Sequence, residues 1–373
     1  MVLETGKRLV ARGHRVDCVC IRADQPIVGT DTGITFHEIG GALSSEFMFW
    51  LRFPDGCKRV TALVTQIVDR DTAERCILFP QVFPVNWWGS YVLAKRPQLK
   101  CVWYCQEPSA FIHSKSWMRA LRWPKNWIAQ GFNPILRSID LRYCKLFQKV
   151  LVNSQYSQRY AQKVYGYSDA RCSVAYLGLD SSRFNFDETE ERKLWITCIA
   201  KLTRFKNVDR IIDAVKRLVD AGENDLQLHI VGTGDARPEL QQQSSRLGLE
   251  SRVIFHGRLS DHDMVQLLRR SRGLCLASVE EPFGLVAVEA MACGTPVIAV
   301  NSGGPAEIVG LTQAGILIDR PDAGLIAGAI RELFDTEKFP ARSAAAQSRA
   351  ADFEWERTVD QLETIFLGEL GFS

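Results

Sequence analysis

The sequence lacks the features of several large classes of protein. No stretch reaches the roughly 18 uninterrupted apolar residues that a membrane-spanning helix needs, and charges between Glu4 and Arg15 leave no apolar centre for a signal peptide. The formal net charge is only +3, from 46 Lys and Arg against 43 Asp and Glu. That is too small for a protein whose whole surface binds nucleic acid or membrane. We therefore expect a soluble or peripheral protein in which any basic surface is local.

Cysteine and histidine also lack the spacings of a disulfide framework or a zinc site. The 11 cysteines are odd in number and include no CxxC pair, and the 6 histidines never fall at ligand spacing from a cysteine pair. Most of the cysteines lie within apolar runs, where a free thiol behaves as a small hydrophobic side chain. These absences predict a reduced, cytoplasmic protein with no metal.

What the sequence does contain is a regular alternation of apolar strands and amphipathic helices. Its 373 residues suit about two domains, since a single core usually stops growing near roughly 250 to 300 residues. In the second half, buried strands are expected over residues 194–200, 226–231, 253–256, 273–277, 296–300 and 315–318, with helices between them. This alternation predicts an α/β domain with a parallel sheet covered on both faces.

The first half is less regular but similar in kind. Strands are expected over residues 15–22, 75–79, 100–104 and 149–152, and helices over 2–12, 85–95 and 154–165. The polar segment 180–193 suits a linker, so we place domains over residues 1–181 and 182–352. The remaining residues, 353–373, form an amphipathic helix that is expected to pack back on the first domain through Trp355, Val359, Leu362 and Phe366.

The most informative segment contains two glutamates, Glu281 and Glu289, separated by seven residues. Pro282 suits the first turn of a helix, and residues 283–285 would leave unpaired N–H groups at the positive helix end, which suits a phosphate. The helix is otherwise apolar, so Glu289 needs partners when buried, and ligand hydroxyls can supply them. In the alternative interpretation, Glu281 only favours the start of the helix and Glu289 is paired with a buried Arg or Lys.

Two lysines and a glycine pair are expected at the same edge of the sheet. Lys201 and Lys206 follow a predicted strand, where open α/β sheets bind ligands. Two ammonium groups there can neutralise a diphosphate leaving group without a metal, although lysines after a strand are most often solvated surface groups. Gly232 and Gly234 let the backbone approach a ligand. Arg237 takes the place of the last glycine of a GxGxxG motif, so a nicotinamide cofactor has little support.

Together these residues resemble the retaining glycosyltransferases of family four, which have the GT-B fold of two facing Rossmann-like domains. The segment EPFGLVAVEAMACGTPVIA (281–299) is similar to the E-x7-E signature of the family, and AKLTRFKNVDRIIDA (200–214) to its phosphate-binding segment. The resemblance covers nearly the whole chain. It implies transfer of a sugar with retention from a UDP- or GDP-sugar to a carbohydrate or lipid-linked acceptor, with no metal or other cofactor.

The resemblance also implies roles for individual residues. Glu281 would contact the donor sugar and Glu289 the ribose, while Lys201 and Lys206 would bind the diphosphate. The remaining donor-binding residues would be Phe283, Gly284 and Leu285 through their backbone amides, Gly232, and His256 and Arg258 near the nucleobase. The leaving diphosphate itself would help to take the proton of the acceptor. The segment AVNSGGPAE (299–307) is similar to mannosyl-transferring relatives.

The chain departs from the family pattern in three places. The family usually has Arg where this chain has Lys201, which keeps the charge and loses bidentate geometry. It often has His in the segment that is residues 104–108 here, where Gln106 cannot act as a base. The acceptor-side candidates are therefore Gln106, Glu107 and His113, and a structural role for His113 is an open alternative. Family members also open with a strand and a glycine-rich loop before the helix in which Met1 falls. The N-terminal domain is therefore expected to be incomplete, through a start-site error or a real loss.

This third departure supports a competing hypothesis, in which the chain is a truncated, non-catalytic homologue that binds nucleotide sugars.

A separate feature concerns residues 116–149, which contain seven basic residues and one acid, Asp140, interleaved with aromatic residues. Such a mixture suits an anionic membrane surface, at the inner face of the membrane, beside a lipid-linked acceptor. A solvated basic face with the aromatic residues in the core is the alternative. No recognised nucleic-acid-binding module accompanies the segment.

Overall fold

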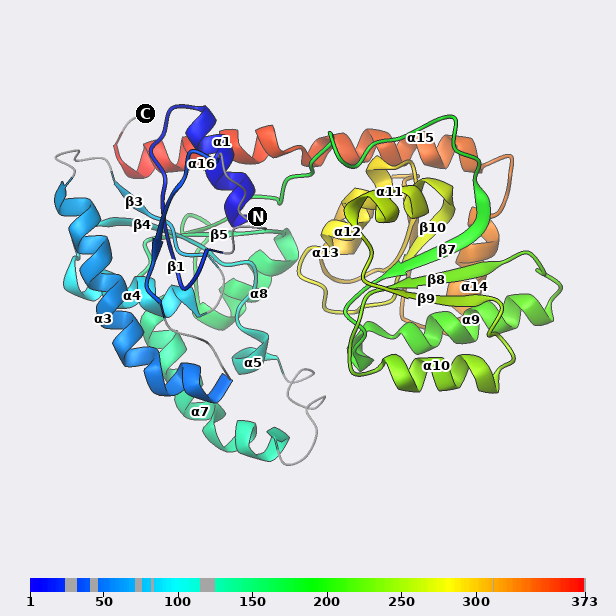
Figure 1. Ribbon diagram of the computed structural model, residues 1–373, viewed down its shortest axis with the longest axis horizontal. Helices are drawn as coiled ribbons and strands as arrows, with labels where there is room; N and C mark the ends of the chain where they lie inside the picture. Colours follow the sequence, from blue (N-terminus) through cyan, green and yellow to red (C-terminus); the bar gives the residue numbers. More distant parts are fainter. Residues whose placement is uncertain are drawn as a thin grey trace.

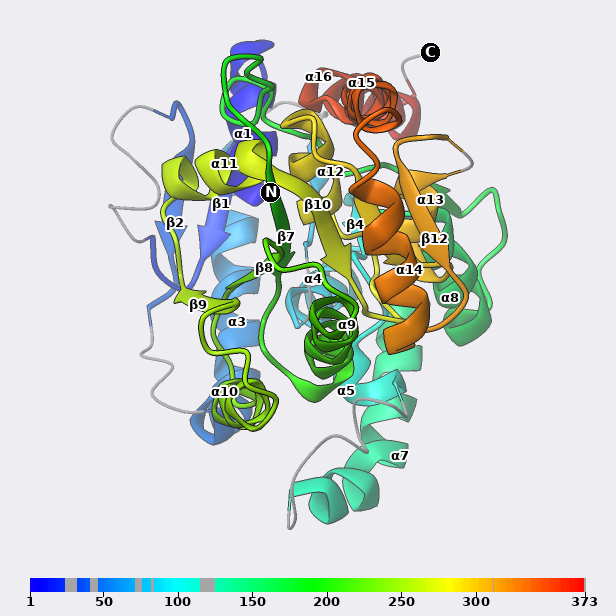
Figure 2. The same cartoon turned by 90° about the vertical axis from the view of Figure 1, so that its right-hand side faces the viewer.

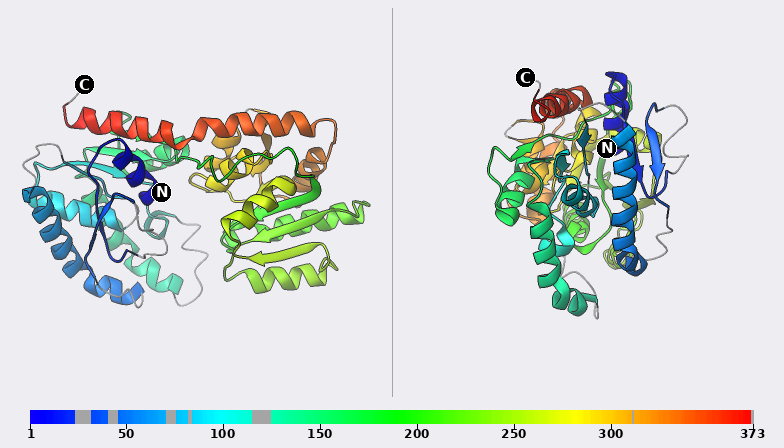
Figure 3. Two further views of the ribbon diagram at one scale, coloured as in Figure 1. Left: turned by 45° about the horizontal axis from the view of Figure 1, so that its top comes forward. Right: turned by 90° about the vertical axis from the view of Figure 1, so that its left-hand side faces the viewer.

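The computed structural model describes residues 1–23, 32–40, 46–70, 76–81, 84–114, 125–310 and 312–371. These residues form two α/β domains that lie side by side, one from each half of the chain (Figure 1). Both domains contain parallel sheets, as the alternation of strands and helices predicts. Two helices at the C-terminal end of the chain run along one side of both domains (Figure 3).

The second domain has a six-stranded parallel sheet with the strand order β12-β11-β10-β7-β8-β9. All six strands expected from the apolar runs are present: β7 (Lys193–Ile199), β8 (Gln227–Val231), β9 (Val253–Gly257), β10 (Ser271–Leu276), β11 (Val297–Val300) and β12 (Gly315–Ile318). From β7 the chain adds strands in one direction, and from β10 it adds them in the other. The carboxyl ends of β7 and β10 therefore flank the point where open sheets of this kind bind ligands.

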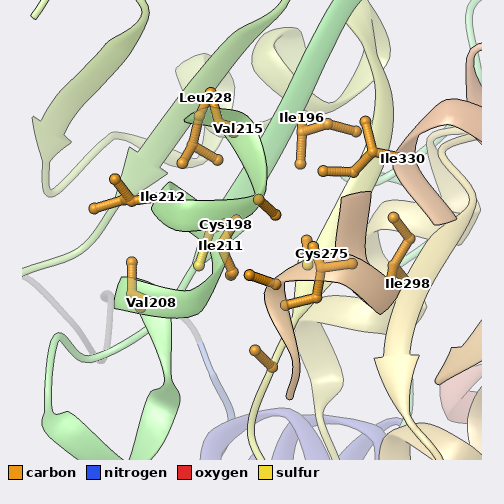
Figure 4. Close-up of a cluster of buried hydrophobic side chains, with 14 of the residues drawn as sticks. Ile196, Cys198, Val208, Ile211, Ile212, Val215, Leu228, Cys275, Ile298 and Ile330 are labelled. Carbon is orange, nitrogen blue, oxygen red and sulfur yellow. The ribbon is translucent and has the colours of Figure 1, made fainter. Parts of the chain in front are cut away.

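Helices cover both faces of this sheet, and each face has its own core (Figure 2). One face is covered by α9 (Val208–Asp220), α10 (Arg237–Arg246) and α14 (Ala323–Leu333). There Val215 of α9 lies beside Leu228 of the sheet, and Ile196 of the sheet lies beside Ile330 of α14 (Figure 4). The other core contains residues of α11 (Asp261–Arg270), α12 (Leu285–Ala292), α13 (Gly303–Val309) and α15 (Phe339–Ala350).

The first domain has two parallel sheets, one of four strands in the order β3-β4-β5-β6 and one of two strands, β1 and β2. Its strands are β1 (Asp17–Cys20), β2 (Thr35–Glu38), β3 (Ile77–Leu78), β4 (Lys100–Tyr104), β5 (Lys149–Val152) and β6 (Cys172–Val174). Its helices are α1 (Val2–Ala11), α3 (Glu46–Arg70), α4 (Val85–Lys95), α5 (Ala110–His113), α7 (Lys125–Cys144) and α8 (Gln155–Tyr165). All four predicted strands are present, although β1 and β3 are shorter than the predicted 15–22 and 75–79. β2, β6, α3, α5 and α7 are additional to the prediction.

The terminal helix α16 (Trp355–Glu369) lies against the first domain, after α15 and the 3₁₀ helix η2 (Ala351–Phe353). Trp355 and Val359 pack with Leu9 of α1 in one cluster, and Leu362 packs in another with Val102 and Leu151 of the four-stranded sheet. The predicted apolar stripe is thus covered by the first domain. Gly178 is needed at this contact, because a Cβ built there would lie 2.3 Å from Cδ2 of Trp355.

All 11 cysteines are free thiols, as their scattered spacing predicts. Among the described residues, no helix is both long and apolar enough to cross a membrane.

Candidate functional site

A lysine and a glutamate form an ion pair at the reversal point of the six-stranded sheet. Lys206 ends the 3₁₀ helix η1 (Arg204–Lys206), which follows β7, and Glu281 lies in the loop after β10. The Lys206 Nζ donates a hydrogen bond to Glu281 Oε2, and the two side chains are 17% and 23% exposed. A positive and a negative group that were expected at one edge from the sequence are therefore in contact, and both remain accessible to a ligand.

The backbone around η1 is fixed by Asn207. This residue has a φ of 52°, in the left-handed region that asparagine tolerates better than most residues. Its Nδ2 donates to the carbonyl of Ala277 at 2.8 Å, just after β10. The side chain of Asn207 therefore joins the two loops that carry Lys206 and Glu281.

The loop after Glu281 ends at Gly284, which is the N-cap of α12 and has a φ of 88°. The helix predicted to follow Pro282 is observed over Leu285–Ala292. In the part of the chain that the structure describes, the N–H groups of Phe283, Gly284 and Leu285 donate no hydrogen bond outside the helix. Unpaired N–H groups at the positive end of a helix are suited to an anion.

Glu289 lies on α12, just over one turn from its start, and is partly buried. The pKa of its carboxyl group is raised to about 7, mainly by burial and also by the nearby charge of Asp261, while Arg183 acts to lower it. Arg183 itself is paired with Asp261 at 2.8 Å. Among the described residues no side chain donates a hydrogen bond to Glu289, so the alternative in which a buried Arg or Lys neutralises it is not what the structure shows.

The two glycines after β8 allow close packing of backbone segments at the same edge. Gly232 has a φ of 125°, and a Cβ built there would lie 1.9 Å from the carbonyl oxygen of Ala200. A Cβ at Gly234 would lie 2.1 Å from the carbonyl oxygen of Leu202. Only glycine fits at these positions, which keeps the Gly232 loop beside the segment that leads to Lys206.

Three other predicted donor-site residues lie at the ends of the same strands. Lys201 is exposed directly after β7, and no ion pair involves it among the described residues. His256 is on β9, where its Nε2 lies 2.9 Å from Nδ1 of His229, and burial lowers its pKa. Arg258 is exposed just after β9. Lys201 and Arg258 are therefore free to meet a ligand, whereas His256 already has a partner.

On the first domain, Glu107 lies in the loop after β4, and the charges of Glu281 and Lys206 affect the pKa of its carboxyl group. Burial raises the pKa of Glu107 to about 7; the charges of Glu281 and Glu280 raise it and that of Lys206 lowers it. Its neighbour Gln106 donates from Nε2 to the Met1 Sδ at 3.3 Å. The predicted acceptor-side loop thus lies near the Lys206–Glu281 pair, across the boundary between the domains.

His113 lies in the interior of the first domain and is bound to Asp140. Their side chains are 1% and 0% exposed, with Nε2 of His113 2.8 Å from Asp140 Oδ2. Asp140 also accepts from Trp87 Nε1 at 2.6 Å and from the Tyr165 hydroxyl at 2.8 Å. Nδ1 of His113 is buried without a partner. This network fits the alternative in which His113 has a structural role. It also shows that Asp140, the single acid within residues 116–149, belongs to a buried hydrogen-bond network.

Sequence reasoning missed the residues that join the two domains beside Glu281. Ser154, the N-cap of α8, donates to the carbonyl of Pro282 at 2.6 Å. Glu307 of α13 accepts from the backbone N–H of Gln155 at 2.9 Å and from the Tyr176 hydroxyl at 2.5 Å. Contacts between residues more than 120 positions apart leave no local pattern in a sequence. No group of three or more potential metal ligands occurs among the described residues.

Comparison with known families supports both the fold and the family. The family model "Glycosyltransferase Family 4" matches residues 1–183, and "Glycosyl transferases group 1" matches residues 181–349. The D-inositol 3-phosphate glycosyltransferase of Rhodococcus jostii is 32% identical over 214 residues, which are 53% of this chain and 47% of that protein. An uncharacterized glycosyltransferase of Methanocaldococcus jannaschii is 23% identical over 83% of this chain and 78% of its own. The chain spans about half the length of the D-inositol 3-phosphate glycosyltransferases that it matches.

Solved structures resemble the chain over almost its whole length. Anabaena Alr3699/HepE in complex with UDP and glucose has a TM-score of 0.75 and 21% identity, covering 98% of this chain and 94% of that one. Sucrose-phosphate synthase of Thermosynechococcus elongatus has a TM-score of 0.78 and 19% identity, covering 100% and 93%. These likenesses confirm the predicted α/β class, with two facing Rossmann-like domains of the GT-B type and a C-terminal helix that crosses back.

Proposed function

The chain belongs to the family 4 glycosyltransferases, in glycosyl transferases group 1, and from this membership we propose that it transfers a sugar from a nucleoside diphosphate sugar to a hydroxyl acceptor with retention. The observation that carries the proposal is the Lys206–Glu281 pair beside the start of α12. One cation, one carboxylate and several free N–H groups meet there at the reversal point of the sheet. A diphosphate and a neutral sugar need this combination of groups.

In the proposed reaction, the second domain holds the donor. Lys201, Lys206 and the N–H groups of residues 283–285 bind the two phosphates, and their positive charge stabilises the diphosphate as it leaves. Glu281 accepts hydrogen bonds from the donor sugar. The bond from the sugar carbon to the phosphate oxygen breaks, and the bond to the acceptor oxygen forms on the same face. The acceptor proton passes to the leaving diphosphate, so no metal is required.

Glu289 is proposed to bind the ribose of the donor. A ribose carries two neighbouring hydroxyl groups, and a carboxylate accepts both. The unpaired, partly buried state of Glu289 supports this role, because ligand hydroxyls would satisfy a charge that is costly to leave alone. Gly232, His256 and Arg258 are proposed to line the remaining part of the nucleotide site, with the last two near the base.

For the acceptor side we propose Gln106, Glu107 and His113, in the first domain of residues 1–181. Glu107 is the most direct of the three, because its carboxyl group responds to the charges of Glu281 and Lys206. Gln106 has no basic atom and can only orient a hydroxyl group. His113 would act through its buried network, since its side chain is only 1% exposed.

The donor is proposed to be a UDP-sugar, with GDP-sugars as the alternative. The support is the family membership together with the HepE structures, which contain UDP, UDP and glucose, or UDP-glucose. A hexose is the proposed sugar, and mannose is the candidate suggested by the 299–307 segment. The acceptor is proposed to be a carbohydrate or a lipid-linked sugar.

A peripheral membrane contact is proposed for the part of residues 116–149 that the structure describes. Residues 116–124 lie outside the described residues. On α7, Phe132 and Ile135 are 61% and 58% exposed, and Arg137 is also exposed. Phe147, in contrast, is in the core of the first domain. Exposed apolar and basic side chains on one helix favour an anionic membrane surface on the cytoplasmic side.

The proposed function is tested by measuring transfer and donor binding together. The parent protein is offered UDP- and GDP-sugars with a broad panel of acceptors, and product anomers are read by NMR. Lys206→Ala should weaken binding of free UDP or GDP in calorimetry by about 1.5 to 3 kcal/mol, the contribution of a charged hydrogen bond. Nucleotide binding without product across the panel supports the non-catalytic alternative. Unchanged UDP and GDP affinity in Lys206→Ala removes the phosphate role.

A further inference from the structure

The first domain touches the loop that carries Glu281 through the start of α8. The Ser154 Oγ donates to the carbonyl oxygen of Pro282 at 2.6 Å, and the Ser157 Oγ donates to the same oxygen at 3.4 Å. The Ser154 Oγ also accepts from the Ser157 N–H at 2.9 Å, which caps α8. One hydroxyl group therefore fixes both the start of α8 and the peptide next to Glu281.

The second domain returns this contact through Glu307 of α13. Its carboxylate accepts from the N–H of Gln155 at 3.1 and 2.9 Å, from the N–H of Tyr156 at 3.4 Å, and from the Tyr176 hydroxyl at 2.5 Å. All three partners belong to the first domain. A carboxylate at the start of α8 is favoured by the partial positive charge of that helix end. Glu307 is thus a charged link between the domains.

The start of α13 also holds the Glu281 loop from the opposite side. The N–H of Gly304 donates to the carbonyl of Glu281 at 2.8 Å. A Cβ at Gly303 would lie 2.5 Å from the Glu281 carbonyl oxygen, and a Cβ at Gly304 would lie 2.4 Å from Cα of Phe283. Residues 281–283 are therefore packed between α8 and α13, and Glu307 joins these two helices directly.

We infer that Glu307 and Ser154 are positioning residues, through which the contact between the domains sets the orientation of Glu281. The inference rests on the proposed function and adds to it how Glu281 is held. Neither residue is placed against the donor; both act through the peptides of 281–283. When the domains meet, Ser154 fixes the Pro282 carbonyl and Glu307 keeps α13 in register with α8. The reacting geometry is then complete only in the associated state of the two domains.

The kinetic test compares Glu307→Ala, Glu307→Gln and Ser154→Ala with the parent. Glu307→Ala and Ser154→Ala should lower kcat by about 10- to 100-fold, because small displacements of an orienting group cost this much. The donor KM and the affinity for free UDP should stay within about twofold, because the phosphate-binding groups are untouched. Glu307→Gln should fall between parent and Glu307→Ala, since its amide oxygen still accepts one hydrogen bond.

The matched control is Glu332→Gln, which neutralises an exposed carboxylate of the second domain that pairs with Arg342 and touches no residue near Glu281. It should leave kcat unchanged. The double variant Ser154→Ala/Glu307→Ala should lose less than the product of the two single losses, because both act on one loop. A rise in donor KM at constant kcat, or single losses that multiply fully, would overturn the inference.

A second readout needs no turnover and separates this inference from the proposed function. Hydrogen exchange is followed in the peptides that cover residues 280–285, with UDP bound. Exchange there should be faster in Glu307→Ala and Ser154→Ala than in the parent, and unchanged in Glu332→Gln. If the parent gives no product, the proposed function fails while this comparison still decides the positioning role. Equal exchange in all four proteins would overturn the inference, whatever the activity.

Discussion

Glu289 carries a carboxyl group whose charge has no partner among the described residues, and its raised pKa makes it a pH-dependent cost to the fold. The pKa in the folded protein is about 7, well above that of an exposed glutamate. At pH values between the pKa of Glu289 in the unfolded chain and its pKa in the folded protein, the folded protein binds more protons than the unfolded chain. The stability that the neutral form contributes is therefore complete in acid and is lost as the pH rises through about 7.

Glu289→Gln should remove this dependence. At pH 8 the variant should be more stable than the parent by about 1 to 3 kcal/mol, since an uncharged amide replaces a buried charge. Near pH 4.5 the two should be equally stable, because Glu289 is then protonated in the parent. Urea unfolding at both pH values measures the difference. If the ribose role is right, the same variant should also bind UDP more weakly. A difference in stability between parent and variant that is the same at both pH values would show that Glu289 does not cause the pH dependence.

Glu107 is expected to govern a second pH effect, on turnover rather than on stability. Its pKa of about 7 means that it is partly protonated at neutral pH. If its carboxylate accepts the hydrogen bond of the acceptor hydroxyl, kcat should rise with pH through this pKa. Glu107→Gln should lower kcat and flatten the profile. If Glu289 binds the ribose as proposed, its carboxyl group does not titrate in this range at saturating donor. A limb of the kcat profile that persists in Glu107→Gln would then assign the titration to another group.

How far single residues are predictable depends on whether their signal is local. Lys206, Glu281 and Glu289 stand in short motifs at fixed distances from predicted strands. The sequence places Lys206 and the start of the helix near Phe283 at one sheet edge, but it does not predict the ion pair of Lys206 with Glu281 that the structure shows. Ser154 and Glu307 are ordinary residues in their own segments. Their importance arises only from a contact across 128 or more residues of sequence, which composition and periodicity do not record.

At the scale of elements, the start of α12 depends on Gly284. This residue has a φ of 88°, and a Cβ there would lie 2.8 Å from Cγ of Pro305. Gly284→Ala should cost about 1 to 2 kcal/mol in stability from the left-handed backbone alone. It should also weaken UDP binding, because the N–H groups that follow would be displaced. Chemical unfolding and calorimetry on the same preparation measure both effects.

Gly328→Ala is the matched control for this change. Gly328 lies inside α14, and a Cβ there would meet nothing within 4 Å. Alanine should stabilise the protein by about 0.5 to 1 kcal/mol, because glycine is unfavourable inside a helix, and UDP affinity should not change. Equal stabilities for the two alanine variants would show that the conformation at Gly284 is not what holds α12.

The accuracy of the element predictions follows the strength of the hydrophobic pattern. The strands of the second sheet are apolar runs buried on both faces, and all six were predicted within about three residues at each end. β2 and β6 are short and carry too few apolar residues to form a recognisable run. α3 contains Pro54, which breaks a helical pattern in the sequence although the helix continues through it.

At the scale of the whole molecule, the described residues include a polar and an apolar kind of contact between the domains. One is the polar contact of α8 with Glu307 and Pro282, and the other is the apolar packing of α16 on the first domain. The second was predictable, because a stripe of large apolar residues at the end of a chain must be covered. The first was not, because polar contacts between domains have no periodicity. The domain limits at residues 181 and 352 remain a prediction.

The apolar interface should dominate the stability of the first domain without contributing to donor binding. Trp355 is 6% exposed and packs with Leu9, Val359 and Gly178. Trp355→Ala should therefore cost about 3 to 5 kcal/mol, the usual loss for a buried tryptophan. Every group proposed to bind the donor lies outside this contact, so UDP affinity at a temperature where the variant is folded should match that of the parent. A melting temperature equal to that of the parent would mean that α16 is not held on the first domain in solution, whereas a loss of UDP affinity would mean that this helix reaches the donor site through the second domain.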